Sequence, residues 1–468
     1  MSKLKNQNAK KFLTVAVASA LCCTLSLSAL LPVFEERENV SAENKNGEIS
    51  TVSPMTGKVD THISDYFNTS VVQKLPDTVK KDEEISVIVR MNIDPIVDEF
   101  QAAGKTRAAQ TVGEFAASGA GKRIAGKIGA AAETLRTRLK KEGLKFELGE
   151  EYNVLMSGFE AKMKASEFED FTAALGNEAT AIVGEVYARC ETQLVTNDVN
   201  VYDTGIFDSS DSKYDGTGTV IAVLDTGLDY THSAFDPARF DAAGARLTQA
   251  SIDGLISRTS ASQTTLGLTA EDVYINAKVP FAYDYADKDP DVYPMASEHG
   301  THVSGVIVGE DDVITGVATN AQLVSMKVFS DVMDGARDSW LLAALEDCTV
   351  LEVDVINMSL GSSAGFSRNE DKTALQEVYD KIQAQGISLI AAASNSFNST
   401  FSSEKNGNLP LTSNPDSATV GSPSTYESTL SVASIKGVKT PYLTYNGSIM
   451  YFTESTNKAS KSKNFVDE

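Results

Sequence analysis

Between residue 216 and about residue 440, short apolar segments rich in β-branched residues alternate with longer amphipathic segments. The short segments have the length and composition of buried strands, and the longer ones have helical periodicity. Parallel strands need long crossover connections, which are usually helices, so this alternation predicts a parallel sheet with helices on both faces. Strands are expected at 218–227, 321–329, 353–361, 387–395 and 430–435, and helices at 338–348 and 371–386.

Polar or small residues stand where three of the expected strands end. Asp225 ends the first strand, the segment Ser359-Leu360-Gly361 ends the third, and Asn395 ends the fourth. In open α/β sheets, ligands bind at the carboxyl ends of the strands. These residues are therefore candidates for one functional site.

The stretch HGTHVSG, which begins at His299, holds two of the four histidines of the chain. An imidazole becomes an effective general base when a carboxylate holds its far nitrogen. We expect Asp225 to hold His299, because the glycines around His299 let the chain turn tightly into a helix. A zinc site is disfavoured, since a third ligand and the glutamate of the zinc-protease motif are both missing. His302 is expected to pack in the interior.

Four motifs in this region resemble, in order, the signatures of the subtilisin-like serine proteases. They are VIAVLDTGLDYTHSAF (220–235), HGTHVSGVIVG (299–309), VDVINMSLGSS (353–363) and LIAAASNS (389–396). The resemblance covers about residues 216–440 and implies a subtilisin-like α/β fold. The long excursion between the first two motifs resembles that of the large lactocepin-like cell-envelope proteinases.

The resemblance also implies a role for each candidate residue. Asp225 would orient the imidazole, His299 would act as the general base, and Asn395 would donate to the oxyanion. The segment Ser359-Leu360-Gly361 would pair with an extended substrate backbone and wall the specificity pocket. His232 would order the loop that follows Asp225.

A smaller α+β domain is expected at residues 84–190, between linkers at 43–83 and 191–215. Its pattern is β-α-β-β-α-β, which is typical of a ferredoxin-like split βαβ sandwich. Its motifs SGFEAKM and AIVGEVY resemble the inhibitory propeptide of the same family. The expected elements are strands at 84–91 and 180–187, a strand pair at 152–163, and helices at 97–141 and 166–175.

The first 42 residues have the order of a secretory signal, with lysines followed by an uncharged run from Phe12 to Phe34. An uncleaved anchor is the alternative, because the run nearly reaches the length of a membrane span. We therefore expect a secreted, extracellular protein whose membrane contact is limited to this segment; cell-wall association is left open. The net charge of −23 argues against nucleic-acid partners.

The nucleophile is the missing piece of this interpretation. The Gly-Thr-Ser-Met-Ala signature of the family does not occur, and the most similar stretch, NGSIM around Ser448, precedes polar residues that could not form a buried helix. In the large family members an accessory domain interrupts the catalytic domain, so residues 441–468 are expected to begin such an insertion. The serine would then lie beyond residue 468, and the chain alone would be inactive.

Two functions follow as expectations. The first is a serine endopeptidase precursor that hydrolyses protein or peptide substrates and is inhibited by its own propeptide. The alternative is a non-catalytic protein whose propeptide-like domain binds and inhibits proteases.

No cofactor is expected, and calcium at the acidic stretch 284–291 is left unassigned. Cys348 is expected to be a buried apolar residue rather than a disulfide partner.

Overall fold

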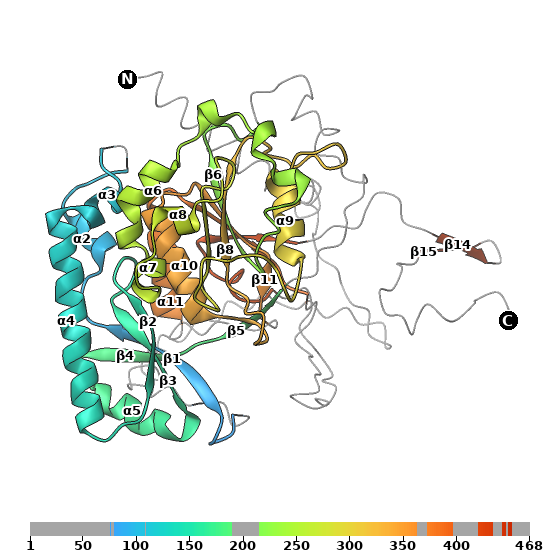
Figure 1. The fold of residues 1–468 in the computed structure, drawn as a ribbon. Coiled ribbons are helices and arrows are strands. Elements are labelled where there is room, and N and C mark those ends of the chain that lie inside the picture. The colour runs from blue at the N-terminus through green and yellow to red at the C-terminus, as the bar shows by residue number, and fades with distance from the viewer. Residues whose placement is uncertain are drawn as a thin grey trace, which may run out of the picture.

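The computed structural model describes residues 75, 79–107, 109–189, 215–362, 372–395, 420–433, 442–445 and 448–451 (Figure 1). The expected signal segment, Cys190 and most of both expected linkers lie outside this part of the chain. Among the described residues, no helix is long and apolar enough to cross a membrane. At the C-terminal end, β14 (Tyr442–Tyr445) and β15 (Ser448–Tyr451) form an antiparallel hairpin in the stretch expected to begin an insertion.

The larger domain is built on a six-stranded sheet in which every pairing is parallel. This confirms the predicted parallel sheet. Strand β7 was not expected, because it lies inside the long excursion between Asp225 and His299. The order across the sheet is β13 (Thr429–Val432), β12 (Ser388–Ala392), β10 (Val355–Met358), β6 (Val220–Asp225), β8 (Gln322–Lys327) and β7 (Phe281–Asp284).

Helices cover both faces of this sheet, so alternate residues of β6 enter two different cores. Val220, Ala222 and Leu224 belong to a core shared with α10 (Asp338–Val350) and α11 (Lys372–Ala384). Ile221 and Val223 join a second core with α9 (His299–Val308). Strand β6 is therefore buried on both faces, as the continuous apolar run in its sequence predicts.

The N-terminal domain has the predicted split βαβ topology, with an antiparallel sheet in the order β2-β3-β1-β4. Its core packs one face of this sheet against α4 and α5. The strands are β1 (Glu84–Met91), β2 (Glu147–Tyr152), β3 (Gly158–Lys164) and β4 (Ala179–Val183), and the helices are α2 (Ile96–Ala102), α3 (Val112–Ala117), α4 (Gly119–Lys141) and α5 (Phe168–Leu175).

Two local predictions in this domain were wrong. The helix expected at 97–141 is three helices, because Thr111 forms a capping box that starts α3 and Ser118 caps α4. The strand pair expected at 152–163 begins earlier, since β2 ends at Tyr152 and residues 153–157 form the turn. The sequence of that turn has the apolar character of a strand. Its amides, however, bind the side chain of Glu346 in the other domain instead of a neighbouring strand.

The strand expected at 180–187 is divided between two sheets. It breaks at Gly184-Glu185, and β5 (Val186–Arg189) leaves the N-terminal domain. Strand β5 pairs with β9 (Ala336–Arg337) on one side and with β11 (Leu360–Gly361) on the other. The three strands form a small antiparallel sheet that belongs to both domains.

A buried carboxylate of α10 holds the turn of the N-terminal domain. Glu346 accepts hydrogen bonds from the backbone amides of residues 153–156, at 2.9 to 3.4 Å. Burial raises the pKa of Glu346 to about 7, while the four amides act in the opposite direction by stabilising the ionised form. This one side chain therefore satisfies four donors of the opposite domain.

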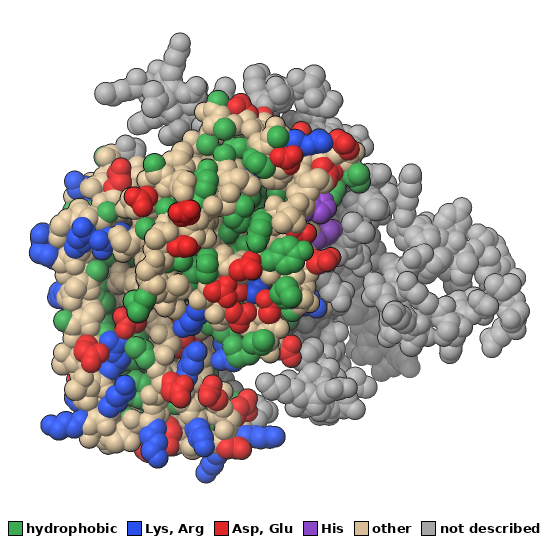
Figure 2. Space-filling view, in the orientation of Figure 1, with side chains coloured by type: hydrophobic (Ala, Val, Ile, Leu, Met, Phe, Trp, Pro, Cys, Tyr) green, Lys and Arg blue, Asp and Glu red, His purple; other side chains and the backbone are tan. Residues whose placement is uncertain are grey.

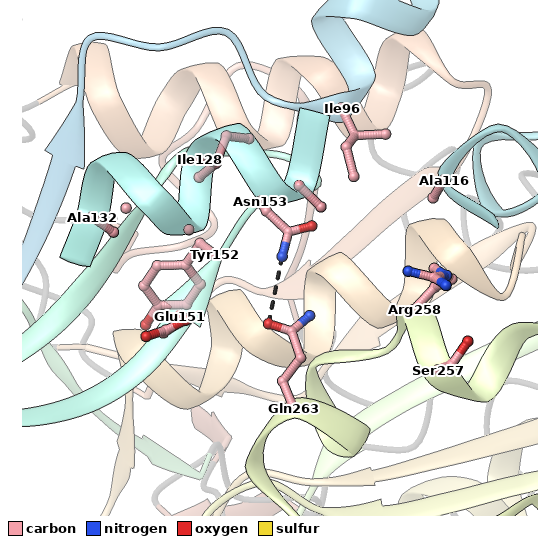
Figure 3. Close-up of a pocket in the computed structure, with 13 residues that line it drawn as sticks. Ile96, Ala116, Ile128, Ala132, Glu151, Tyr152, Asn153, Ser257, Arg258 and Gln263 are labelled. Carbon is pink, nitrogen blue, oxygen red and sulfur yellow. Dashed lines mark hydrogen bonds between the residues drawn. The ribbon is translucent and has the colours of Figure 1, made fainter. Parts of the chain in front are cut away.

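The rest of the interface is looser. A cavity of about 220 Å³ lies between α4 and residues 257–263, bordered by Ile128, Ala132 and Arg258 and crossed by a 3.4 Å hydrogen bond from Asn153 to Gln263 (Figure 3). Basic side chains gather mainly on the N-terminal domain (Figure 2). Among the described residues, three ion pairs that cross the interface are partly exposed on both sides, so each contributes little to the stability of docking; they are Arg90–Glu377, Arg107–Asp354 and Lys381–Asp98. A fourth pair joins Lys288 to the buried carboxylate of Glu150 at 2.8 Å.

We predict that Glu346→Ala lowers the free energy that keeps the N-terminal domain docked by roughly 2–4 kcal/mol, because several buried amides lose their charged acceptor. Hydrogen exchange of amides 153–156 and of β5 should accelerate together. The control is Glu377→Ala, which removes a partly exposed carboxylate of the same interface and should cost less than about 1 kcal/mol. Equal acceleration in the two variants would contradict this role of Glu346.

Candidate active site

Asp225 and His299 meet at the carboxyl edge of the sheet. Asp225 is the last residue of β6 and His299 is the first residue of α9. The Nδ1 atom of His299 lies 2.7 Å from Oδ1 of Asp225, although 74 positions separate the two residues in sequence. Their side chains are 8% and 1% exposed, respectively. The buried carboxylate therefore fixes the orientation of the ring and leaves Nε2 on the side of the ring away from Asp225.

The residues beside this pair fix its geometry. The Thr226 amide donates to Oδ1 of Asp225, and the Thr226 hydroxyl accepts from the Gly300 amide and donates to the carbonyl of Ser297. Gly300 packs so closely that a Cβ atom would collide with the carbonyl oxygen of Gly227. The turn into α9 therefore requires glycine after His299.

The other predicted residues lie at the same edge, because β6, β10 and β12 run parallel. Ser359 follows β10 and accepts a hydrogen bond from Asn357, and Leu360 and Gly361 form β11. Asn395 follows β12 by three residues, with an exposed side chain. The structure thus brings the candidate segments to one edge. The segment proposed to bind an extended backbone pairs with β5 of the chain itself.

The remaining histidines near the site have local contacts. His232 Nδ1 accepts from the Ala234 amide and caps a short 3-10 helix after the Asp225 loop. His302 is partly buried, and its Nδ1 atom has no hydrogen-bond partner among the described residues. The buried Cys348 is a free thiol, and burial raises its pKa. None of these contacts assigns a catalytic role to the three residues.

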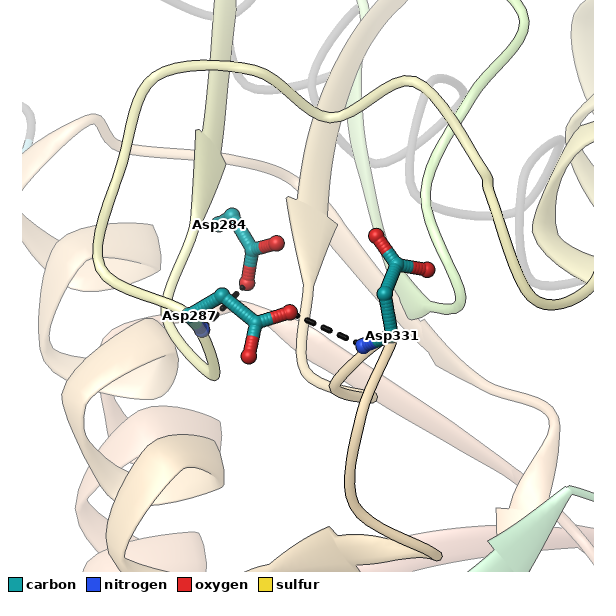
Figure 4. Close-up of side chains that lie close together, drawn as sticks. All are labelled: Asp284, Asp287 and Asp331. Atoms are coloured by element: carbon teal, nitrogen blue, oxygen red, sulfur yellow. Dashed lines mark hydrogen bonds between the residues drawn. The ribbon is translucent and has the colours of Figure 1, made fainter.

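An acidic cluster lies on the far side of β8 from β6. Asp284, Asp287 and Asp331 direct carboxylate oxygens within 4.8 Å of one another (Figure 4). All three contact the ammonium of Lys327, which is 1% exposed; the distances are 3.3 Å to Asp287 and 2.9 Å to Asp331. Burial lowers the pKa of Lys327, but the hydrogen bonds and charges of Asp284 and Asp331 outweigh it, so the pKa is raised and the ammonium stays charged. The cluster already holds a cationic side chain, so its donor set does not fit a resident calcium ion.

Sequence reasoning missed Lys327, Asp338 and Glu346. A signal for the last two was present, because acidic residues interrupt the otherwise apolar segment DSWLLAALEDC. A charged group is buried in a helix only when partners satisfy it. Those partners lie far away in sequence, so the signal marks an interface without naming its other side.

The ordered motifs and the buried Asp–His pair agree with a comparison against known families, since the subtilase family model matches residues 216–465. The chain belongs to the subtilase family. A PI-type proteinase of Lactococcus lactis subsp. cremoris is 27% identical over 455 residues, which cover 92% of this chain and 22% of that relative. This subtilase chain therefore spans less than a quarter of the relative's length.

Two further similarities are more limited. A C5a peptidase of Streptococcus pyogenes is 33% identical over 231 residues, or 47% of this chain and 18% of that protein. Among solved structures, the epidermin leader peptide processing serine protease of Staphylococcus aureus aligns over 75% of this chain and 69% of its own, with 15% identity and a TM-score of 0.41.

We predict that Lys327→Met lowers the stability of this subtilase domain by roughly 3–5 kcal/mol, because it leaves the buried Asp284 and the partly buried Asp287 and Asp331 without their counter-ion. Urea unfolding measures the loss. The matched control is Arg239→Met, whose partner Asp312 is 89% exposed, and it should cost less than about 1 kcal/mol. The interpretation would be wrong if calcium, added to the unmodified protein, displaced the lysine and raised its stability.

Proposed function

We propose that the chain is the precursor form of a secreted serine endopeptidase, with Asp225 and His299 as the proton-transfer pair. The observation that carries the proposal is the buried 2.7 Å contact between them, at the sheet edge where an extended strand is already bound. The subtilase membership supports a serine-type peptidase. The expected signal segment supports an extracellular location.

In this mechanism His299 removes the proton from a serine hydroxyl as that oxygen attacks the substrate carbonyl. The imidazole then returns the proton to the leaving amine. Asp225 holds the ring in the required tautomer and stabilises its charged form. Asn395 would donate to the oxygen that becomes negative in the tetrahedral intermediate. The family serine signature is absent from the 468 residues, so the nucleophile is left unassigned.

The position of strand β5 supports the proposal that this chain is a precursor. It occupies the position next to Leu360 and Gly361 that an extended substrate would need for its backbone hydrogen bonds. We propose that residues 84–189 act as an inhibitory propeptide, because they place this strand in the cleft and are anchored at Glu346. Protein or peptide substrates would enter only after β5 leaves.

The alternative, a non-catalytic inhibitor of other proteases, needs the binding face of the N-terminal domain to be accessible. In the described part of the chain that face is covered, since the turn at 153–156 contacts Glu346 and β5 lies between β9 and β11. The geometry therefore favours inhibition within one chain over inhibition of a partner.

We predict that His299→Ala lowers the kcat of peptide hydrolysis by roughly 10⁶-fold and abolishes labelling by a fluorophosphonate. That magnitude is the one known for subtilisin. The test uses protein secreted from the full gene. His232→Gln is the matched control, because it changes an exposed histidine that only caps a turn, and it should leave the rate nearly unchanged.

Two results would count against the proposal. One is persistent hydrolysis in His299→Ala protein that retains its thermal stability. The other is unmodified protein that neither reacts with the probe nor cleaves peptides but inhibits a second protease. That second result would favour the alternative function.

A further inference from the structure

Strand β5 directs one side chain into the larger domain. Tyr187 is 1% exposed, whereas Val186 is 58% exposed, and Ala188 and Arg189 are also exposed. The backbone register is fixed on both sides, since Tyr187 pairs with Ala336 of β9 and Ala188 pairs with Gly361 of β11. The recognition of β5 by side chain therefore depends mainly on Tyr187.

The pocket around Tyr187 is apolar except at its end. The ring belongs to the same core as Trp340, Leu360 and Tyr379. Its hydroxyl donates a 2.5 Å hydrogen bond to Oδ1 of Asp338, and Asp338 is itself only 3% exposed. A ring with a hydroxyl therefore suits this pocket, because the hydroxyl reaches the buried carboxylate of Asp338.

Among the described residues, the Asp338 carboxylate accepts two hydrogen bonds, and both come from the bound segment. The second comes from the backbone amide of Glu185, at 2.7 Å to Oδ2. Burial raises the pKa of Asp338 to about 7, as expected for a carboxylate whose loss of water is only partly compensated. The loss of either donor would leave a buried charge with one partner fewer, which is costly.

The backbone beside the pocket is shaped to admit a strand. Gly335 has a φ of +79°, and a Cβ atom there would lie 2.8 Å from the carbonyl oxygen of Tyr187. Glycine therefore allows both the left-handed turn and the close approach of the bound backbone. The pocket and the strand-binding groove are parts of one site.

We propose that this site recognises tyrosine in extended peptide substrates, and that Asp338 selects the tyrosine hydroxyl. The proposal rests on the proposed function, because it takes β5 to occupy the place of a substrate strand. Sites that hydrogen-bond a substrate hydroxyl discriminate strongly against the analogue that lacks it, since the site is then left unpaired. The selected position is two residues before the one that pairs with Leu360.

The test compares peptides that copy residues 183–194 and differ only at the position of Tyr187. We expect kcat/KM for the tyrosine peptide to exceed that for the phenylalanine peptide by roughly 10- to 100-fold. A peptide with alanine in place of Val186 is the matched control and should be cleaved nearly as well as the parent peptide. Equal rates for the tyrosine and phenylalanine peptides would overturn the proposal.

Enzyme variants assign the preference to Asp338. Asp338→Leu should remove the preference for tyrosine by lowering the rate for the tyrosine peptide and sparing the phenylalanine peptide. Asp338→Asn keeps an acceptor oxygen of the same shape and should show an intermediate preference. A uniform loss of rate for both peptides in folded Asp338→Asn protein would mean that Asp338 is only structural, and would overturn the assignment.

A binding measurement separates this proposal from the proposed function. Protein secreted from the full gene and carrying Tyr187→Ala should hold its own β5 less firmly and bind a fluorescent tyrosine peptide, with anisotropy as the readout. Preferential binding of the tyrosine peptide without hydrolysis would support the site and refute the peptidase. Hydrolysis of both peptides at the same rate would support the peptidase and refute the site.

Discussion

Three carboxylates of one buried helix connect the separate parts of this molecule. All thirteen residues of α10 are buried, and three of them are acidic. Asp338 accepts from β5, Glu346 accepts from the turn at 153–156, and Asp347 accepts from the amides of Ser260 and Ala261 and from the hydroxyl of Tyr285. An isolated charge in such a place would be strongly destabilising, so each carboxylate requires its distant partner. The helix thereby specifies where the strand, the domain and the long excursion must dock.

The Asp225–His299 pair depends on the same framework through the sheet. Strand β6 lies between β8 and β10, and its register with them places Asp225 at the carboxyl edge of the sheet. The chain then travels through the excursion and β7 before it returns at α9. Thr226 and Gly300 close the gap, the first through its hydroxyl and the second through the absence of a side chain. The contact between two such distant residues is therefore a product of sheet register and one tight turn.

Much of the fold could be predicted from the sequence, because the hydrophobic period of the parallel strands and of β1 is a local signal. The meeting of Asp225 and His299 could also be anticipated, since both were assigned to the carboxyl edge of one sheet. The pairing of β5 with the larger domain could not be predicted. Val186-Tyr187 continues the sequence pattern of β4, and nothing local shows that the chain changes direction at Gly184-Glu185. The burial of Lys327 could not be predicted either, since a lysine at the end of an apolar strand is ordinarily solvent-directed. Two of its three carboxylates, Asp284 and Asp287, come from the end of β7 and the loop after it, far away in sequence.

The docking of the N-terminal domain is best understood as specific rather than strong. Its partly exposed ion pairs contribute little, and a cavity interrupts the contact near Asn153 and Gln263. The contacts made by buried carboxylates are those of Glu346, Asp338 and Glu150, and each of these groups gains polar partners while losing water. Because charge burial opposes hydrogen bonding at Glu346 and Asp338, the net gain is small even though a wrong partner would be heavily penalised. Such an interface selects one docked position of the N-terminal domain without holding the domain tightly in it.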